Sequence, residues 1–296
     1  MLKVSGFYVI IIVRFFKGVK RVPYIIIISA LLGLCLLLFF ALIGRGGEDF
    51  SLFLKNPIAH RGLHSEDGPP ENSLAAFKRA IEKGCSIELD VHLLKDGTLA
   101  VFHDDDLFRM TGKEGRLRDL SLSELKELTL KNSNEKIPTF GEVLETVDGK
   151  VPLLIELKTG GKTAELCSSV MEALKDYKGR FCIESFDPRH LWWLRRHRPD
   201  IKRGVISENL KNSPVFPLIF IRFLISALFL NFLIAPDFVA YRFSNRKNLL
   251  FRISVKIWRI KGFVWTIKTA DDYKTAINEG FIPICEKIFS GKDAVK

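Results

Sequence analysis

The sequence predicts an α/β fold, a TIM (β/α)8 barrel preceded by one N-terminal transmembrane helix. After residue 55, short apolar runs alternate with longer amphipathic stretches, and repeated alternation of strand and helix builds a parallel sheet. Roughly 250 residues follow the first apolar segment, which is the usual length of one closed barrel of eight such units. The third observation is an unbroken apolar run near the start of the chain, long enough to cross a bilayer.

Nine apolar runs have the length and composition of strands, one more than a barrel of eight needs. They cover residues 57–60, 86–94, 99–103, 152–157, 181–185, 203–206, 238–241, 263–267 and 281–285. Amphipathic helices are predicted over residues 73–83, 162–177, 188–198, 245–260 and 270–278. Asn72 or Ser73 is the expected N-cap of the first of these helices.

The extra strand is explained by a hairpin within residues 89–103. Asp96-Gly97 is a strong signal for a two-residue turn between antiparallel strands. Counting back from that turn places Asp90 opposite His103. The hairpin would therefore deliver a histidine to the neighbourhood of a strand carboxylate.

The N-terminal part of the chain is predicted to anchor it in a membrane. Residues 24–43 carry no charge, whereas the preceding segment, 1–23, carries five Lys or Arg residues. Positive charge favours the cytoplasmic side, so we expect a cytoplasmic N-terminus, a linker at 44–55 and an extracytoplasmic barrel at 56–296. The run is long for a signal peptide and no A-x-A site follows, which favours an uncleaved, single-pass anchor.

A second apolar run covers residues 215–235 and contains Pro217, Arg222 and Asn231. A single crossing of the membrane there would put strands of one sheet on opposite sides, so we reject it. Two alternatives remain open. The segment is a helix buried against the barrel, or a helix with one face dipped into the bilayer.

Composition narrows the range of partners. The net charge of +11 and the pI near 9.4 suit an anionic membrane, acidic substrates or nucleic acid. No zinc-finger spacing or RNA-binding aromatic signature accompanies the basic residues, so no nucleic acid partner is expected. The five cysteines include no CxxC pair, which favours small buried hydrophobic side chains over a zinc or redox site.

Charged residues alternate with apolar ones on two predicted strands. Glu88 and Asp90 share one face of the first, and Glu156 and Lys158 share one face of the second. Both faces of a parallel barrel strand are covered, so charges there need ionic partners or a metal. Three carboxylates form an oxygen site of the kind that Mg²⁺ or Ca²⁺ prefers.

Two histidines stand where predicted strands end. His60 precedes Arg61 and follows the first strand, and His103 ends the third. Histidine suits proton transfer near neutral pH, while Arg61 and Lys158 suit an anion. Together with a cation that neutralises developing charge, these residues indicate phosphoryl chemistry. A paired-carboxylate glycosidase would have no use for the two histidines.

Seven short motifs of this chain occur in the order seen in a known family. They are His60-Arg61-Gly62, Glu71-Asn72-Ser73, Glu88-Leu89-Asp90-Val91, Phe102-His103-Asp104, Glu156-Leu157-Lys158, Ser185-Phe186 and Trp265-Thr266. Over residues 56–286 the chain resembles glycerophosphodiester phosphodiesterases, in particular membrane-anchored members of bacterial type. Each triplet alone is a weak signal, whereas their combination is specific.

The resemblance implies a TIM barrel that releases sn-glycerol 3-phosphate and an alcohol from glycerophosphodiesters. In this family the 2-hydroxyl of the glycerol attacks phosphorus, and water then opens the cyclic phosphate. The implied roles are acid–base catalysis for His60 and His103, ligation of Mg²⁺ or Ca²⁺ for Glu88, Asp90 and Glu156, phosphate binding for Arg61 and Lys158, an acidic site edge for Glu71, and a wall of the glycerol pocket for Trp265.

The chain departs from the family pattern at two places. Lys268 stands where many members have Asn, and Glu286 stands where an Asp-containing turn is common. Neither is expected to touch the metal ligands or the histidines.

The other histidines have less specific interpretations. His92 shares the strand face of Asp90, and a surface position is expected for it. His64 follows Gly62 in a loop, where contact with substrate is one alternative. His190 and His197 lie on an Arg-rich helix, for which a solvated face or a membrane-surface position is expected.

Two alternatives to the main function remain. The same chemistry could act on lysophospholipid held in the membrane, as a lysophospholipase D does. The chain could also be an inactive, membrane-anchored binding protein, although the complete set of histidines and carboxylates argues against that.

Overall fold

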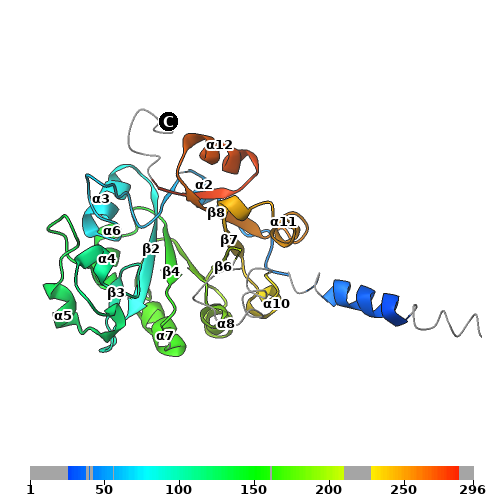
Figure 1. Ribbon diagram of the computed structural model, residues 1–296, viewed down its shortest axis with the longest axis horizontal. Helices are drawn as coiled ribbons and strands as arrows, with labels where there is room; N and C mark the ends of the chain where they lie inside the picture. The colour runs from blue at the N-terminus through cyan, green and yellow to red at the C-terminus, as the bar shows by residue number, and fades with distance from the viewer. Residues whose placement is uncertain are drawn as a thin grey trace, which may run out of the picture.

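The computed structural model describes residues 26–37, 40, 43–55, 57–160, 162–209 and 228–286. Eight parallel strands form a closed barrel (Figure 1), because the first strand pairs with both the second and the last. These strands are β1 (Ile58–Ala59), β2 (Ser86–Leu93), β4 (Leu153–Leu157), β5 (Phe181–Ser185), β6 (Arg203–Ser207), β7 (Phe238–Arg242), β8 (Lys261–Ile267) and β9 (Ile282–Cys285). The predicted barrel is confirmed.

Helices surround the strands (Figure 1). Those in the described residues after position 50 are α2 (Ser51–Lys55), α3 (Leu74–Glu82), α4 (Phe108–Thr111), α5 (Leu122–Glu127), α6 (Phe140–Val147), α7 (Thr163–Ala173), α8 (Pro188–His197), α10 (Asn231–Ile234), α11 (Leu249–Lys256) and α12 (Ala270–Asn278). Ser73 is the N-cap of α3, where its hydroxyl accepts a hydrogen bond from the Ala76 backbone. This choice resolves the alternative between Asn72 and Ser73.

The extra strand, β3 (Leu99–Val101), pairs antiparallel with β2 as predicted, but its register differs by one residue. Leu94 pairs with Thr98 around a three-residue turn that ends in Gly97 with φ +86°. Asp90 therefore lies opposite Phe102, whose backbone N–H donates to the Asp90 carbonyl at 3.0 Å. The prediction that Asp90 faces His103 is wrong, because two-residue hairpin turns need a positive φ at their first residue, Asp96, whereas only Gly97 has one.

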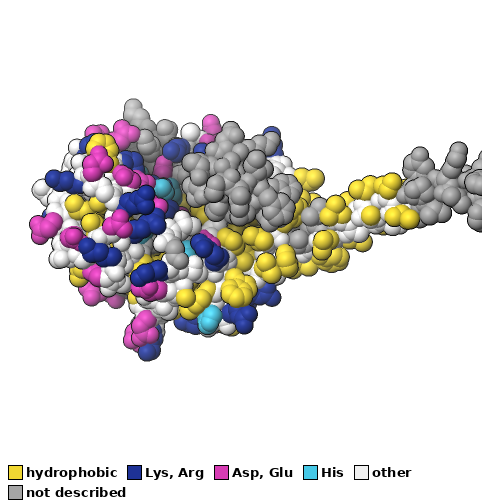
Figure 2. All heavy atoms as spheres, turned by 60° about the horizontal axis from the view of Figure 1, so that its bottom comes forward, with side chains coloured by type: hydrophobic (Ala, Val, Ile, Leu, Met, Phe, Trp, Pro, Cys, Tyr) yellow, Lys and Arg dark blue, Asp and Glu magenta, His cyan; other side chains and the backbone are white. Residues whose placement is uncertain are grey.

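An apolar helix extends from the barrel at the N-terminal side (Figures 1 and 2). Residues 26–37 are helical and their large apolar side chains are exposed. Within the described ranges, no helix combines the length and apolar character that crossing a membrane requires. The predicted span, 24–43, includes residues outside those ranges. So does the predicted apolar segment 215–235, of which only residues 228–235 are described.

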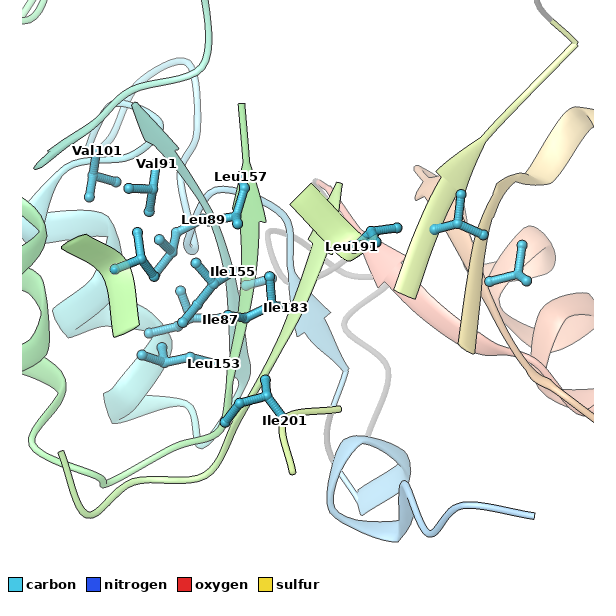
Figure 3. Close-up of a cluster of buried hydrophobic side chains, with 14 of the residues drawn as sticks. Ile87, Leu89, Val91, Val101, Leu153, Ile155, Leu157, Ile183, Leu191 and Ile201 are labelled. Atoms are coloured by element: carbon cyan, nitrogen blue, oxygen red, sulfur yellow. The ribbon is translucent and has the colours of Figure 1, made fainter. Parts of the chain in front are cut away.

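The core has two layers separated by the wall of strands. Outward side chains of β2 and β4, such as Ile87 and Ile155, pack beneath the surrounding helices (Figure 3). Inward side chains fill the barrel, and Phe50 and Phe53 close its amino-terminal end against Phe263. The apolar filling leaves the carboxyl end of the barrel for polar side chains.

Candidate active site

A cleft of about 320 Å³ opens at the carboxyl ends of the strands. Its polar lining comes from residues on or just after β1, β2, β4, β5, β8 and β9, together with the segment after β3. The lining residues are His60, Arg61, Glu88, His103, Glu156, Glu184, Phe186, Ile206, Trp265, Thr266, Lys268, Ile284 and Glu286. Most of the predicted site residues are therefore gathered around a single cavity.

Three buried carboxylates lie together at this cleft, which Glu88 and Glu156 line directly. The parallel register places Asp90 of β2 beside Glu156 of β4, and Glu88 lies two residues earlier on the same face of β2. One oxygen from each carboxylate lies within 4.8 Å of the others. The alternation of charged and apolar residues on two neighbouring strands thus builds the cluster that the sequence predicts.

The carboxylates of this cluster are buried and repel one another. Burial raises the pKa of Glu88 well above its ordinary value, and the neighbouring Asp90 and Glu156 add to that effect. Burial alone would raise the pKa of Asp90, but Lys158 and then His103 hold it far below the usual range. Lys158 Nζ lies 3.2 Å from Asp90 and 2.9 Å from Glu156. Arg61 Nε lies 3.6 Å from Asp90, so two cationic side chains face three carboxylates.

The residues present fit a divalent cation. All three ligand candidates supply hard oxygen atoms, and all three are buried. Asp90 Oδ1 accepts no hydrogen bond within the described part of the chain, although Lys158 lies near it. A cation held by Glu88, Asp90 and Glu156 would satisfy that oxygen and remove the repulsion that raises the pKa of Glu88.

His60 is held where β1 meets β9, the two strands that close the barrel. Its backbone N–H donates to the Cys285 carbonyl, and its Nδ1 lies 2.6 Å from Glu286 Oε1. Burial would raise the pKa of Glu286, but the hydrogen bonds from His60 and Lys268 hold it well below its usual range. An ionised carboxylate only accepts, so Nδ1 of His60 donates and Nε2 is left toward the cleft, 3.8 Å from Glu88.

His103 has a similar arrangement. Its Nδ1 lies 2.6 Å from Asp104 Oδ1, and Arg109 donates to the other oxygen of that carboxylate. Burial would raise the pKa of Asp104, but the bonds from His103 and Arg109 keep it well below the usual range. Nδ1 of His103 is therefore also a donor. The residue reaches the cleft from the segment that follows β3, which is why the shifted register does not remove it from the site.

The cationic edge of the site is built around Glu71. Its carboxylate pairs with Arg61 Nη1 at 2.8 Å and with Arg109 Nη2 at 2.6 Å. Asn72 donates from its side chain to Asp90 at 2.8 Å, which connects this edge to the carboxylate cluster. The glycine at position 62 lets this segment pack closely against α3. Any Cβ there would lie only 2.9 Å from the ring of Phe77.

Trp265 forms an apolar wall of the cleft. Its indole N–H donates to the Ala240 carbonyl at 3.1 Å. Phe186 meets its ring edge to face, with 5.9 Å between the centroids. The two rings give the cleft one apolar side opposite its charged side.

Sequence reasoning missed three carboxylates and two cations of the site, of which Arg109 binds Glu71 and Asp104. Glu286 bonds His60, and Lys268 lies 2.9 Å from Glu286. The expectation that Glu286 does not contact a histidine is therefore wrong, since β9 and β1 are neighbours in a closed barrel. Asp104 is the third partner, next to His103 in the chain.

Glu184 is the remaining missed carboxylate. The register of β4 and β5 places it beside Glu156, and burial raises its pKa well above the usual value. Its Oε2 accepts no hydrogen bond within the described residues. The sequence around it, Cys182-Ile183-Glu184, alternates like the other strands, so the same strand-face argument could have found it.

Two of the remaining histidines are buried, contrary to expectation. His92 is 4% exposed and its Nε2 lies 3.3 Å from the His103 carbonyl. His190 is 1% exposed, and Nδ1 lies 3.0 Å from the Ser185 hydroxyl. Each bonds a group at a strand end, which compensates the burial of a polar ring.

The fold and site define the class of this protein: a (β/α)8 barrel with a buried carboxylate cluster and two carboxylate-bound histidines at the carboxyl ends of its strands. The chain belongs to the Glycerophosphoryl diester phosphodiesterase family, whose profile matches residues 60–285. The resemblance drawn from the short motifs is confirmed at the level of the family.

Individual relatives match either a shorter part of the chain at higher identity or a longer part at lower identity. A glycerophosphodiester phosphodiesterase of Caldanaerobacter subterraneus is 39% identical over 162 residues, which cover 51% of this chain and 66% of the relative. The chain thus spans just under two thirds of that relative. Glycerophosphodiester phosphodiesterase 1 of Bos taurus is 28% identical over 255 residues, 76% of each chain.

Solved structures share the fold. An Oleispira antarctica phosphodiesterase, solved in complex with the product sn-glycerol-3-phosphate, superposes with a TM-score of 0.64 at 26% identity. The superposition covers 78% of this chain and 92% of the other.

Proposed function

We propose that this chain hydrolyses glycerophosphodiesters to sn-glycerol 3-phosphate and an alcohol, with a requirement for Mg²⁺ or Ca²⁺. The observation that carries the proposal is that His60 and His103, both with Nδ1 bound to a carboxylate, line the same cleft as the carboxylate cluster. Membership of the family supports it, as does the product bound to the Oleispira relative.

The geometry suggests how the chain's own groups act. Burial lowers the pKa of His60, although the bond to Glu286 opposes this effect, so its imidazole is neutral near pH 7. A neutral Nε2 can take the proton of the attacking 2-hydroxyl of the glycerol. His103 donates a proton to the alcohol oxygen as the bond from phosphorus to that oxygen breaks. Water then opens the cyclic phosphate, with the two proton transfers reversed.

Charge stabilisation completes the reaction. Arg61 and Lys158 bring positive charge to the phosphate. A divalent cation on Glu88, Asp90 and Glu156 would neutralise charge that develops on the phosphoryl oxygens. Arg61 is fixed by Glu71, and Lys158 by Asp90 and Glu156, so both cations are ordered before substrate binds.

A second candidate is hydrolysis of lysophospholipid by the same groups. Phe186 lines the main cleft and also a small apolar cavity formed with Pro188, Val205, Leu228 and Ile234 among others. An apolar side next to the site would suit a substrate whose glycerol carries an acyl chain, with the head group as the leaving alcohol.

We further propose that residues 24–43 anchor the chain in a membrane as a single span. The exposed apolar side chains of residues 26–37 support this, as does the cationic segment before them. The charge distribution favours a cytoplasmic N-terminus and an extracytoplasmic barrel.

Product analysis tests the proposed function. The full-length chain in detergent is incubated with glycerophosphocholine or lysophosphatidylcholine, with Mg²⁺, with Ca²⁺ or with EDTA, and the products are followed by phosphorus NMR. We expect metal-dependent release of sn-glycerol 3-phosphate from glycerophosphocholine. Turnover of the lysolipid alone would favour the second candidate. No turnover of either diester by folded protein would favour an inactive binding protein.

A further inference from the structure

An exposed apolar surface lies on the barrel wall beside the N-terminal helix (Figure 2). Trp192 of α8 is 45% exposed, and Phe232 and Leu233 of α10 are 52% and 42% exposed. A groove of about 330 Å³ runs between these helices, lined by Pro188, Arg189, Trp192, Leu230, Leu233 and Ile234. We call this surface the α8–α10 face. Large apolar side chains gathered on one face usually mark a binding surface.

The chain joins the barrel next to this face through a tight junction. The Arg45 backbone N–H donates to the Pro236 carbonyl, directly after α10, at 2.7 Å. Arg45 also donates from its side chain to the Pro199 carbonyl, after α8. A Cβ on Gly46 would lie 2.2 Å from the Trp258 carbonyl oxygen, so only glycine fits there. The apolar N-terminal segment and the α8–α10 face are thereby held together.

Apolar contact continues from this junction toward the N-terminus. Phe40 is 52% exposed, and its ring lies 6.0 Å from that of Trp258. Ile257 beside it is 55% exposed. The exposed apolar side chains therefore extend from residues 26–37 over the junction to the barrel wall (Figure 2).

Arginine side chains border the α8–α10 face. Arg195 donates to the carbonyls of Phe232 and Leu233 at 2.8 and 2.6 Å. The Arg196 guanidinium lies 5.0 Å from the centroid of the Trp192 ring. Aromatic and aliphatic side chains rimmed by arginines are typical of helices that lie in the headgroup region of an anionic bilayer.

We propose that the α8–α10 face rests on an anionic phospholipid bilayer, which gives the barrel a second membrane contact beside its N-terminal segment. The proposal rests on the membrane anchor proposed for residues 24–43. Continuity with the apolar segment and the net charge of +11 favour a lipid surface over a protein partner.

Spin labels on the full-length chain test this proposal. Cys35 is exchanged for Ser, and the other four cysteines are buried, so a single introduced cysteine carries the label. Leu233→Cys reports on the face, and Leu31→Cys reports on the anchor. Leu122→Cys is the matched control, because Leu122 is 40% exposed and belongs to α5, which lies across the molecule from α10 (Figure 1).

The variants are reconstituted in nanodiscs of phosphatidylcholine with or without phosphatidylserine. Relaxation by oxygen, which concentrates in lipid, is compared with relaxation by a water-soluble nickel chelate. We expect oxygen to dominate at positions 31 and 233 and the nickel chelate at 122. The ratio of relaxation by oxygen to relaxation by the nickel chelate at position 233 should increase several-fold when phosphatidylserine is present. Arg196→Glu should reduce this increase, whereas Lys113→Glu, at an exposed lysine elsewhere, should not.

The outcomes separate the proposals. If oxygen dominates relaxation at position 31 (a lipid signal) and the nickel chelate dominates at position 233 (a water signal), docking is overturned and the anchor is left intact. A water signal at 31 overturns the anchor and docking with it. Shielding of 233 from both reagents means that protein covers the face, which also overturns docking. Turnover of glycerophosphocholine, measured on the same samples, reports on the proposed reaction independently.

Discussion

Nδ1 of His60 lies 2.6 Å from Oε1 of Glu286, although 226 residues separate the two in sequence. Closure of the barrel creates this contact, because Ala59 of β1 pairs with Cys285 of β9. Lys268, at the end of β8, holds the other carboxylate oxygen at 2.9 Å. The chain thus orients one catalytic candidate with residues from its far end.

Glu286→Gln is expected to lower kcat by about 10–100-fold with little change in KM, since it weakens the orientation of His60 without touching substrate. Loss of the Glu286 charge also removes an influence that raises the pKa of His60. The pKa then falls further, and the acidic limb of the kcat/KM profile moves to lower pH. Glu279→Gln, at a surface carboxylate paired with Arg246, is the control. An unshifted profile would contradict the proposed orientation.

Asp104→Asn is expected to impair turnover similarly, because Asp104 holds His103 at 2.6 Å. The neighbouring Asp105→Asn is a close control, since Asp105 is paired with Arg118 and is half exposed. Steady-state kinetics on glycerophosphocholine compare the two. Equal effects of both substitutions would show that His103 does not depend on this carboxylate.

Glu156→Gln is expected to weaken binding of the divalent cation by at least about tenfold, whereas Glu184→Gln should change it only a few-fold. Both residues are buried neighbours, but only Glu156 belongs to the cluster within 4.8 Å. Calorimetric titration with Ca²⁺ or Mg²⁺ measures the affinities. If Glu184→Gln abolished binding while Glu156→Gln did not, the assigned ligand set would be wrong.

His92 should make stability depend on pH. Burial, and then the charge of Lys158, lowers its pKa from 6.5 to about 4. The unfolded chain therefore binds a proton that the folded chain excludes, and stability present above pH 6.5 is lost as pH falls toward 4. The loss should reach about 3 kcal/mol, at ~1.4 kcal/mol per pKa unit. Denaturant unfolding in EDTA would show a weaker dependence for His92→Asn, and an unchanged one would exclude His92 as the source.

The junction at Gly46 should tolerate no side chain. Gly46→Ala places a Cβ against the Trp258 carbonyl and should lower the free energy of unfolding by about 1–3 kcal/mol. Gly141→Ala in α6 meets nothing within 4 Å and should be neutral or stabilising by up to about 1 kcal/mol. Thermal unfolding compares them. Equal stability of the two variants would contradict the tight junction.

Local patterns predicted most of the barrel. The bounds of β5 and α12 match the predicted ranges, because strand and helix periodicities are strong there. Helix α6 was not predicted, although Thr139 and Glu142 form a capping box that signals its start. The hairpin register was wrong by one residue, since turn length depends on the backbone conformation of Gly97.

Some residues of the site were likewise predictable from local pattern, whereas others depend on long-range packing. Glu88, Asp90 and Glu156 were predictable because strand alternation fixes the face on which they lie. The contact between His60 and Glu286 depends on which strands become neighbours when the barrel closes, and that is a long-range property. The burial of His92 and His190 likewise depends on packing between elements.

Turnover of glycerophosphocholine after metal removal and restoration tests the central claim most directly. The full-length chain is stripped with EDTA, and release of sn-glycerol 3-phosphate is then measured as Mg²⁺ or Ca²⁺ is added back. His60→Ala and His103→Ala are measured beside it. We predict that activity returns with the cation and is about 10²–10⁴-fold lower in each variant. Full activity without cation, or in either variant, would contradict the account.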